Sequence, residues 1–182
     1  MTLETRKLRN EELGRLSVER FRESKKTPLY IILDDIRSLL NIGSVFRTAD
    51  CYRVAKIYLC GISARPPHRD IRKTALGATD SVEWEYHDNI NELVGELKEQ
   101  GIQVASIEQA EKSISLHKFQ PAVSEGLAIV LGNEVNGVSQ QVVSLSDHVV
   151  ELEHYGTKHS LNVAVCAGIV VYDLYYKLVS PS

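Results

Sequence analysis

Three stretches of the sequence carry residues that could do chemistry, and the first is NIGSVFRTAD at residues 41–50. Its apolar residues recur at helical spacing, and Gly43 and Arg47 lie one turn apart on the side away from them. A guanidinium can bind an anionic group through paired hydrogen bonds. Glycine destabilises a helix by about 1 kcal/mol relative to alanine. Its presence one turn before an arginine therefore raises the question of which function requires a residue without a side chain at this position.

The second stretch, LAIVLGNEVNGVS at residues 127–139, is a buried strand that runs into a turn. Gly132 and Gly137 permit backbone geometry that side chains forbid, and can expose amides and carbonyls to a ligand. Glu134 follows at the end of the strand. It is either part of a site there or an ordinary surface carboxylate.

The third stretch, HYGTKHSLNVAVCAG at residues 154–168, is a polar loop that leads into an apolar helix. We expect Ser160 to cap this helix, which then begins at that residue. Asn162 faces either a site at the helix start or the core. In both cases its amide needs a hydrogen-bond partner.

Other catalytic signatures are missing from the sequence. It has no glycine-rich nucleotide-binding motif, no nucleophile elbow and no paired metal-binding histidines. Cys51, Cys60 and Cys166 are too few and too irregularly spaced to be metal ligands, and they fit a reducing cytoplasm. We therefore expect no metal, no signal peptide and a cytoplasmic location.

Strand-like apolar runs alternate with helical patterns along the chain. The expected strands lie at 29–35, 55–61, 81–87, 102–108, 126–133 and 148–153, and the expected helices at 4–25, 41–53, 70–78, 89–101, after Ser139 and from Ser160. Either Ser38 or Asn41 lies near the cap of the second helix. Several strands are apolar on both faces, which indicates a mostly parallel sheet flanked by helices. Ligands bind such sheets beyond the carboxyl ends of the strands.

Charge is unevenly distributed over the 182 residues, whose net charge is −3. Lys and Arg exceed Asp and Glu in residues 1–28. A second basic cluster at 65–73 contains Arg65, Arg69, Arg72 and Lys73. Basic patches on an acidic body indicate contact with an anionic partner at defined places, although solvated charged faces have the same pattern. The most apolar segment, 161–179, is interrupted by polar and charged residues, so we expect a buried helix and no membrane span.

Together the three stretches resemble the SpoU (TrmH-like) family of RNA ribose 2′-O-methyltransferases, within the SPOUT superfamily. The matching residues are Asn41, Gly43 and Arg47-Thr48-Ala49 in the first motif, Gly132-Asn133-Glu134 and Gly137-Val138-Ser139 in the second, and Gly156 and Ser160-Leu161-Asn162-Val163 in the third. The resemblance covers about residues 28–178. One departure is Leu152-Glu153-His154, where the family usually has an Ile-Pro-Met-like segment; Glu153 and His154 are then expected at the edge of the cofactor pocket.

The resemblance implies an α/β fold with a mostly parallel sheet flanked by helices and a C-terminal trefoil knot. Residues 1–27 would be a basic helical arm and residues 28–182 the methyltransferase domain. The implied catalytic residues are Arg47, Asn41, Glu134, Ser160 and Asn162. S-adenosylmethionine would be held by Leu131, Gly132, Asn133, Val150, Leu152, Gly156 and Leu161. RNA would contact Arg65, Arg69, Arg72 and Lys73, and the Gly43–Arg47 surface would be an RNA-facing wall.

The resemblance also bears on partners. Family members are typically homodimers in which the first-motif arginine acts near the partner's cofactor, and the face of the last helix with Val163, Ala167 and Val170 could supply part of the interface. The short arm favours tRNA as substrate, with rRNA as the alternative. Two other readings stay open: an RNA-binding protein that has lost catalysis, and a related enzyme that methylates a base.

Overall fold

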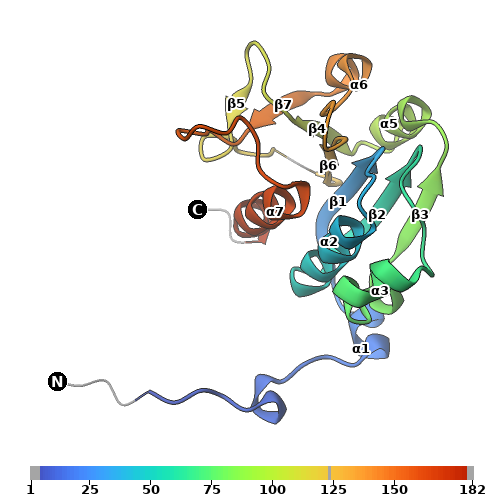
Figure 1. The fold of residues 1–182 in the computed structure, drawn as a ribbon, viewed down its shortest axis with the longest axis vertical. Helices are drawn as coiled ribbons and strands as arrows, with labels where there is room; N and C mark the ends of the chain where they lie inside the picture. The colour runs from blue at the N-terminus through green and yellow to red at the C-terminus, as the bar shows by residue number, and fades with distance from the viewer. Residues whose placement is uncertain (1–4, 123, 180–182) are drawn as a thin grey trace.

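The computed structural model describes residues 5–122 and 124–179. Within them, seven strands form one all-parallel sheet in the order β3-β2-β1-β6-β4-β7-β5 (Figure 1). The strands are β1 (Thr27–Asp34), β2 (Val54–Cys60), β3 (Trp84–His87), β4 (Gln103–Ile107), β5 (Ile114–Ser115), β6 (Leu127–Leu131) and β7 (His148–Glu151). The predicted fold class, a parallel sheet flanked by helices, is confirmed.

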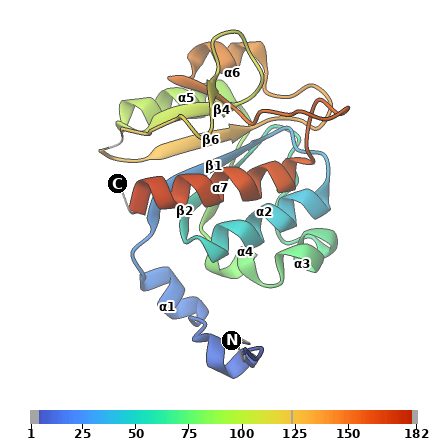
Figure 2. The same cartoon turned by 90° about the vertical axis from the view of Figure 1, so that its left-hand side faces the viewer.

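Helices cover both faces of the sheet (Figure 2). On one face lie α2 (Leu39–Cys51), α3 (Arg69–Ala75), α4 (Ala78–Ser81) and α7 (Val163–Val179), and on the other α5 (Ile90–Glu99) and α6 (Gln140–Leu145). Ile31 and Leu33 of β1 pack in the cluster that contains α2 and α7, whereas Ile32 packs with α5 and α6. The alternation of side chains along a strand explains this division of one apolar run between two cores.

The N-terminal segment differs from the single helix expected at 4–25, of which residue 4 lies outside the described residues. The chain forms only a short 3₁₀ helix, η1 (Asn10–Leu13), and α1 (Val18–Glu23). Gly14 ends η1 in the left-handed conformation, with φ of 59°, and α1 buries only Phe21. A short helix that buries little is marginal, and in Figures 1 and 2 this segment extends away from the sheet.

The last helix corrects two expectations. It begins at Val163 rather than Ser160, and the side chains of Val163, Ala167 and Val170 are buried in the protein's own core. That face is therefore not available to a second subunit. The exposed apolar residues of α7 are instead Val165, Ile169, Tyr172, Tyr176 and Val179.

Between β7 and α7 the chain crosses from one end of the sheet to its middle, because β7 lies beside β4 and β5 whereas α7 packs on α2 and β1. The crossing segment, residues 152–162, passes the carboxyl ends of the strands. The trefoil knot itself stays a prediction from the resemblance. No helix in the described part of the chain is long and apolar enough to cross a membrane.

Candidate functional site

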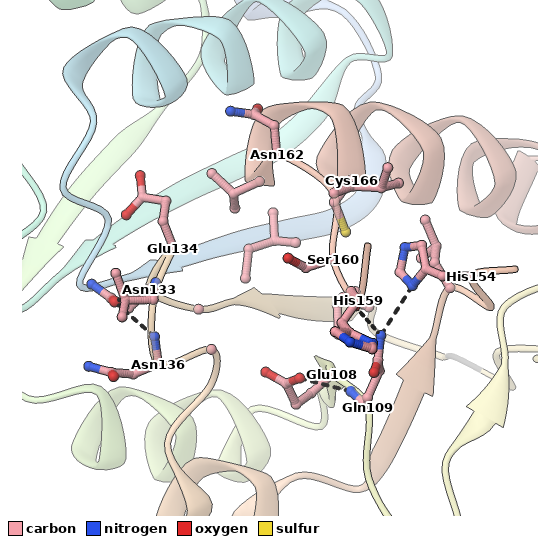
Figure 3. A pocket seen from close by; sticks show the side chains of 18 residues that line it. Glu108, Gln109, Asn133, Glu134, Asn136, His154, His159, Ser160, Asn162 and Cys166 are labelled. Atoms are coloured by element: carbon pink, nitrogen blue, oxygen red, sulfur yellow. Dashed lines mark hydrogen bonds between the residues drawn. The ribbon is translucent and has the colours of Figure 1, made fainter. Parts of the chain in front are cut away.

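A pocket of about 510 Å³ lies where β4 and β6 end and the crossing segment passes over them (Figure 3). Its apolar lining includes Ile107, Leu131, Leu152, Leu161 and Val163. Its polar lining comes from the turn after β6, from Glu108 and Gln109 after β4, and from the crossing segment. A pocket with apolar walls and few polar groups is typical of small-molecule sites.

The two glycines of the second motif allow the turn after β6 to fold back on itself. A Cβ atom on Gly132 would overlap the backbone of Gly137 and Val138, and Gly137 has φ of 66°. The Asn133 side chain holds the turn, because its Oδ1 accepts from the backbone N–H of Val135 and Asn136 at 2.9 and 3.1 Å. The two glycines thus allow two segments of the protein's own backbone to approach each other closely.

Glu134 joins the first motif to the second. Its two carboxylate oxygens accept hydrogen bonds from the backbone N–H of Arg37 at 3.0 Å and of Ser38 at 3.1 Å, and from Asn41 Nδ2 at 3.1 Å. Burial alone would raise the pKa of this carboxyl, but the hydrogen bonds from Arg37, the backbone of Glu134 itself, Asn41 and Ser38 lower it overall. Glu134 is therefore an ionised clamp on the start of α2, not an idle surface carboxylate.

Asn162 joins the third motif to the same group. Its Nδ2 donates to Asn41 Oδ1 at 3.1 Å, so Glu134, Asn41 and Asn162 form a continuous chain of hydrogen bonds. Its Oδ1 accepts from the backbone N–H of Ala164 at 2.9 Å. Asn162 is thus the residue that caps α7, whereas Ser160, expected in that role, is exposed in the crossing segment and lines the pocket.

Gly43 does not form the open surface expected for the first motif. It is buried, and a Cβ atom there would overlap Ile71 O and Thr74 Oγ1 of α3. The glycine is needed because two helices cross closely at this point. Arg47, one turn further on, is exposed and does not line the pocket, and it makes no side-chain hydrogen bond or ion pair with any described residue.

The residues expected to hold the cofactor are only partly brought together. Five of them line the pocket: Leu131, Gly132, Asn133, Leu152 and Leu161. Val150 is buried in β7, outside the lining. Gly156 lies on an adjoining pocket of about 610 Å³. The pocket itself agrees with the rule that parallel sheets bind ligands beyond the carboxyl ends of their strands.

Sequence reasoning missed Glu108 and Gln109, which follow directly after β4. Glu108 Oε2 accepts from the backbone N–H of Val138 at 2.8 Å. Gln109 Nε2 lies 2.6 Å from the carbonyl oxygen of His159 and 3.1 Å from His154 Nδ1. Both residues lie at the carboxyl end of the strand expected at 102–108. That position could have identified them as candidate site residues, because ligands bind parallel sheets there.

His154 presents an unused hydrogen-bond donor. Because the Gln109 amide donates to its Nδ1, the proton of the neutral ring is assigned to Nε2. That nitrogen is buried and has no partner among the described residues, and in Figure 3 the ring lies at the edge of the pocket. Glu153 turns away from this pocket and accepts from Ser115 Oγ at 2.9 Å.

The second basic cluster lies on the loop after β2 and on α3. Arg65 is exposed, with its Cζ 4.1 Å from the centroid of the Tyr86 ring. Arg69, Arg72 and Lys73 are exposed on α3. Since α3 packs on α2 at Gly43, the three basic residues of α3 and Arg47 lie on neighbouring helices.

Comparisons with known proteins agree with this architecture. A family model described as the SpoU rRNA methylase family matches residues 28–172. The 23S rRNA (guanosine-2′-O-)-methyltransferase RlmB of Neisseria meningitidis serogroup B is 31% identical over 144 residues, which are 79% of this chain and 56% of that protein. The chain spans 56 to 61% of the length of the first curated relatives that it matches.

Two solved structures share the fold. The TrmH/SpoU tRNA modifying enzyme of Aquifex aeolicus superposes with a TM-score of 0.78 at 24% identity, over 88% of this chain and 81% of that chain. The AdoMet-bound rRNA methyltransferase of Sinorhizobium meliloti gives a TM-score of 0.77 at 21% identity, over 86% and 59%. Because the family model covers most of the residues from β1 to α7, the chain belongs to the SpoU rRNA methylase family.

Proposed function

We propose that the protein transfers a methyl group from S-adenosylmethionine to a ribose 2′-hydroxyl of RNA. One observation carries the proposal: the hydrogen-bonded chain Glu134–Asn41–Asn162 unites the three family motifs at the rim of the pocket. The relatives described above support it, since their names describe 2′-O-methylation of guanosine in rRNA, modification of tRNA and binding of AdoMet.

The first pocket fits a cofactor of this chemistry. Its volume of about 510 Å³ lies within the usual range for small-molecule sites, about 300–1,000 Å³. Leu131, Leu152 and Leu161 provide apolar surface, and His154, whose buried Nε2 has no partner among the described residues, lies at the edge of the pocket. When bound, S-adenosylmethionine supplies an electrophilic methyl group on a positively charged sulfur. The residues that would hold it are those of the turn after β6 and of the crossing segment.

The protein's own residues have to position the ribose and stabilise the charge that develops on its oxygen. Positioning of this kind can lower a barrier by about 7–11 kcal/mol. In our proposal Asn41, Glu134, Ser160 and Asn162 orient the reacting groups. Arg47 binds the neighbouring phosphate and stabilises the alkoxide; proton abstraction by its side chain is less suitable, because a guanidinium does not release its proton readily in proteins.

Arg47 does not reach the pocket of its own chain, so we propose that it acts in the pocket of a second subunit. The exposed apolar side chains of α7 support a homodimer, since Val165, Ile169 and Tyr172 form an apolar face that no described residue of the same chain covers. As substrate we propose tRNA, with rRNA as the alternative. The tRNA modifying enzyme supports this choice because the two chains match over most of both lengths.

Replacing Arg47 tests the proposed activity. Arg47→Ala should abolish transfer of labelled methyl groups to RNA while leaving the Kd for S-adenosylmethionine, measured by calorimetry, nearly unchanged. Retained turnover would contradict the role of Arg47. If the unaltered protein transfers no label to any RNA, the alternative of a non-catalytic RNA-binding protein is correct.

The basic cluster on α3 offers a separate test of RNA contact. The double variant Arg69→Gln/Arg72→Gln should raise the Kd for tRNA and flatten the dependence of log Kd on log salt by roughly 0.7–0.9 for each lost phosphate contact. Glu96→Gln, on the opposite face of the sheet, is the matched control. An unchanged salt slope would mean that both arginines are merely solvated.

A further inference from the structure

A second pocket, of about 470 Å³, lies beside the first at the carboxyl edge of the sheet. Asp34 and Asp35 at the end of β1 line it, together with Ile62 after β2 and Ser139 before α6. The two pockets share the turn 133–137, which forms a wall between them. A group that enters the second pocket therefore lies next to whatever occupies the first.

Asp34 is an acceptor without a donor among the described residues. Its side chain follows Ile32 onto the α5/α6 face and is only 7% exposed. Among the described residues it has no hydrogen-bond or ion-pair partner, whereas Asp35 Oδ1 accepts from the backbone N–H of Ile62 at 2.9 Å. Leaving a buried carboxylate unpaired is costly. Burial, and then the charge of Asp35, raise the pKa of Asp34 to about 6.

The lining of the pocket limits what could satisfy Asp34. The lining carries two carboxylates against the single guanidinium of Arg37, a net negative charge that disfavours a phosphate. The described residues hold no cluster of three side chains that could bind a metal. Ile62 and Val135 are 67% and 73% exposed and stand at this pocket, so aliphatic surface is available to a planar ring. The chemistry favours a flat, neutral group that carries N–H donors.

We propose that the second pocket binds the target nucleobase and that Asp34 selects guanine by accepting from its N1–H and 2-amino groups. Guanine is the RNA base with two adjacent N–H donors on its Watson–Crick edge, and a carboxylate has two oxygens to receive them. Enzymes that act on a nucleotide read an unstacked base at this edge. The inference rests on the proposed function, because the base must belong to the nucleotide whose ribose is methylated.

The decisive measurement identifies the modified nucleoside. The full chain is incubated with labelled S-adenosylmethionine and total RNA from cells that lack the protein, and the RNA is then digested to nucleosides. We expect the label in 2′-O-methylguanosine. Label in another nucleoside would overturn the proposal that Asp34 selects guanine, while the proposed methyl transfer to RNA would stand. Absence of all label would overturn the proposed function as well.

A variant and an altered substrate test Asp34 itself. Asp34→Asn should lower kcat/KM by at least about tenfold, since a paired contact to a base edge is lost, with the Kd for S-adenosylmethionine unchanged. Asp80→Asn, an exposed acid on α4, is the control. Inosine at the mapped position lacks the 2-amino group and should react several-fold more slowly with the unaltered protein, even if the variant does not fold. Equal rates for guanosine and inosine, or full activity of Asp34→Asn, would refute the proposal.

Discussion

Glu134 and Asp34 stand on the rims of two adjoining pockets, and their surroundings are opposite. Glu134 is exposed yet accepts three hydrogen bonds from Arg37, Ser38 and Asn41. Asp34 is buried and accepts none from the described residues. Buried polar groups are normally the satisfied ones, so this reversal indicates that Glu134 supports the architecture of the site whereas Asp34 is kept free for a ligand.

Removal of Glu134 should have the largest effect. Glu134→Ala releases the start of α2 and deprives Asn41 of its acceptor, and a misplacement of about 1 Å in an active site can lower the rate about 100-fold. Because the carboxylate is exposed, water can replace it, and the free energy of unfolding should fall by only about 1 kcal/mol. Methyl-transfer rates and urea denaturation measure the two effects. Near-normal kcat would refute the clamp.

Asp34→Asn should instead stabilise the fold at neutral pH. The folded protein binds the Asp34 proton more tightly than the unfolded chain, so the ionised group costs stability above pH 6, and this cost disappears as the pH falls toward 4. We expect a gain of about 1–3 kcal/mol at pH 7.5 and almost none at pH 4. Asp35, Arg37 and Cys60 are the ionisable groups near the carboxylate.

Urea denaturation of both proteins at pH 7.5, 6 and 4 measures this difference. Asp80→Asn serves again as the control and should change little at any pH. A variant that is less stable than the original protein at pH 7.5 would mean that Asp34 has a donor in the folded state. The proposed difference between Glu134, which has hydrogen-bond donors, and Asp34, which has none among the described residues, would then be wrong.

The smallest expected effect concerns His154, whose buried Nε2–H has no partner among the described residues and lies at the edge of the first pocket. His154→Ala removes the Nε2–H, and loss of one hydrogen bond of about 1 kcal/mol should weaken binding of S-adenosylhomocysteine about fivefold. Calorimetry measures the Kd, with His117→Ala as the control because His117 is exposed outside this pocket. Equal Kd values for His154→Ala and the original protein would show that this donor meets no ligand.

The sequence predicted the parallel sheet because its strands are continuous apolar runs with clear ends. It also singled out Asn41, Glu134 and Asn162, which the structure brings into one hydrogen-bonded chain. Local sequence pattern could not reveal these contacts, because Asn41 is 93 residues from Glu134 and 121 residues from Asn162 along the chain.

The expectations that the structure corrects are wrong for a similar reason, because they depend on contacts between distant parts of the chain. The sequence predicts an open surface at Gly43 because its neighbour α3 lies far along the chain and helical periodicity does not reveal it. Ser160 and Asn162 are both good capping residues, and the choice between them depends on the bond from Asn162 to Asn41. The sequence pattern places Asp34 only within the expected strand 29–35, because the absence of a donor to it among the described residues is a property of the folded protein.

The turn 133–137 has a consequence for how the two pockets communicate. Asn133 ties it to β1, because its Nδ2 donates to the backbone oxygen of Asp35 at 2.8 Å, while its Oδ1 holds the backbone of the turn. A ligand that shifts this turn from one side changes the space on the other. If binding in one pocket alters affinity in the other, thermodynamic linkage requires the same factor in both directions. Cofactor and nucleotide would then bind as a coupled pair, and one thin turn would set the strength of their cooperativity.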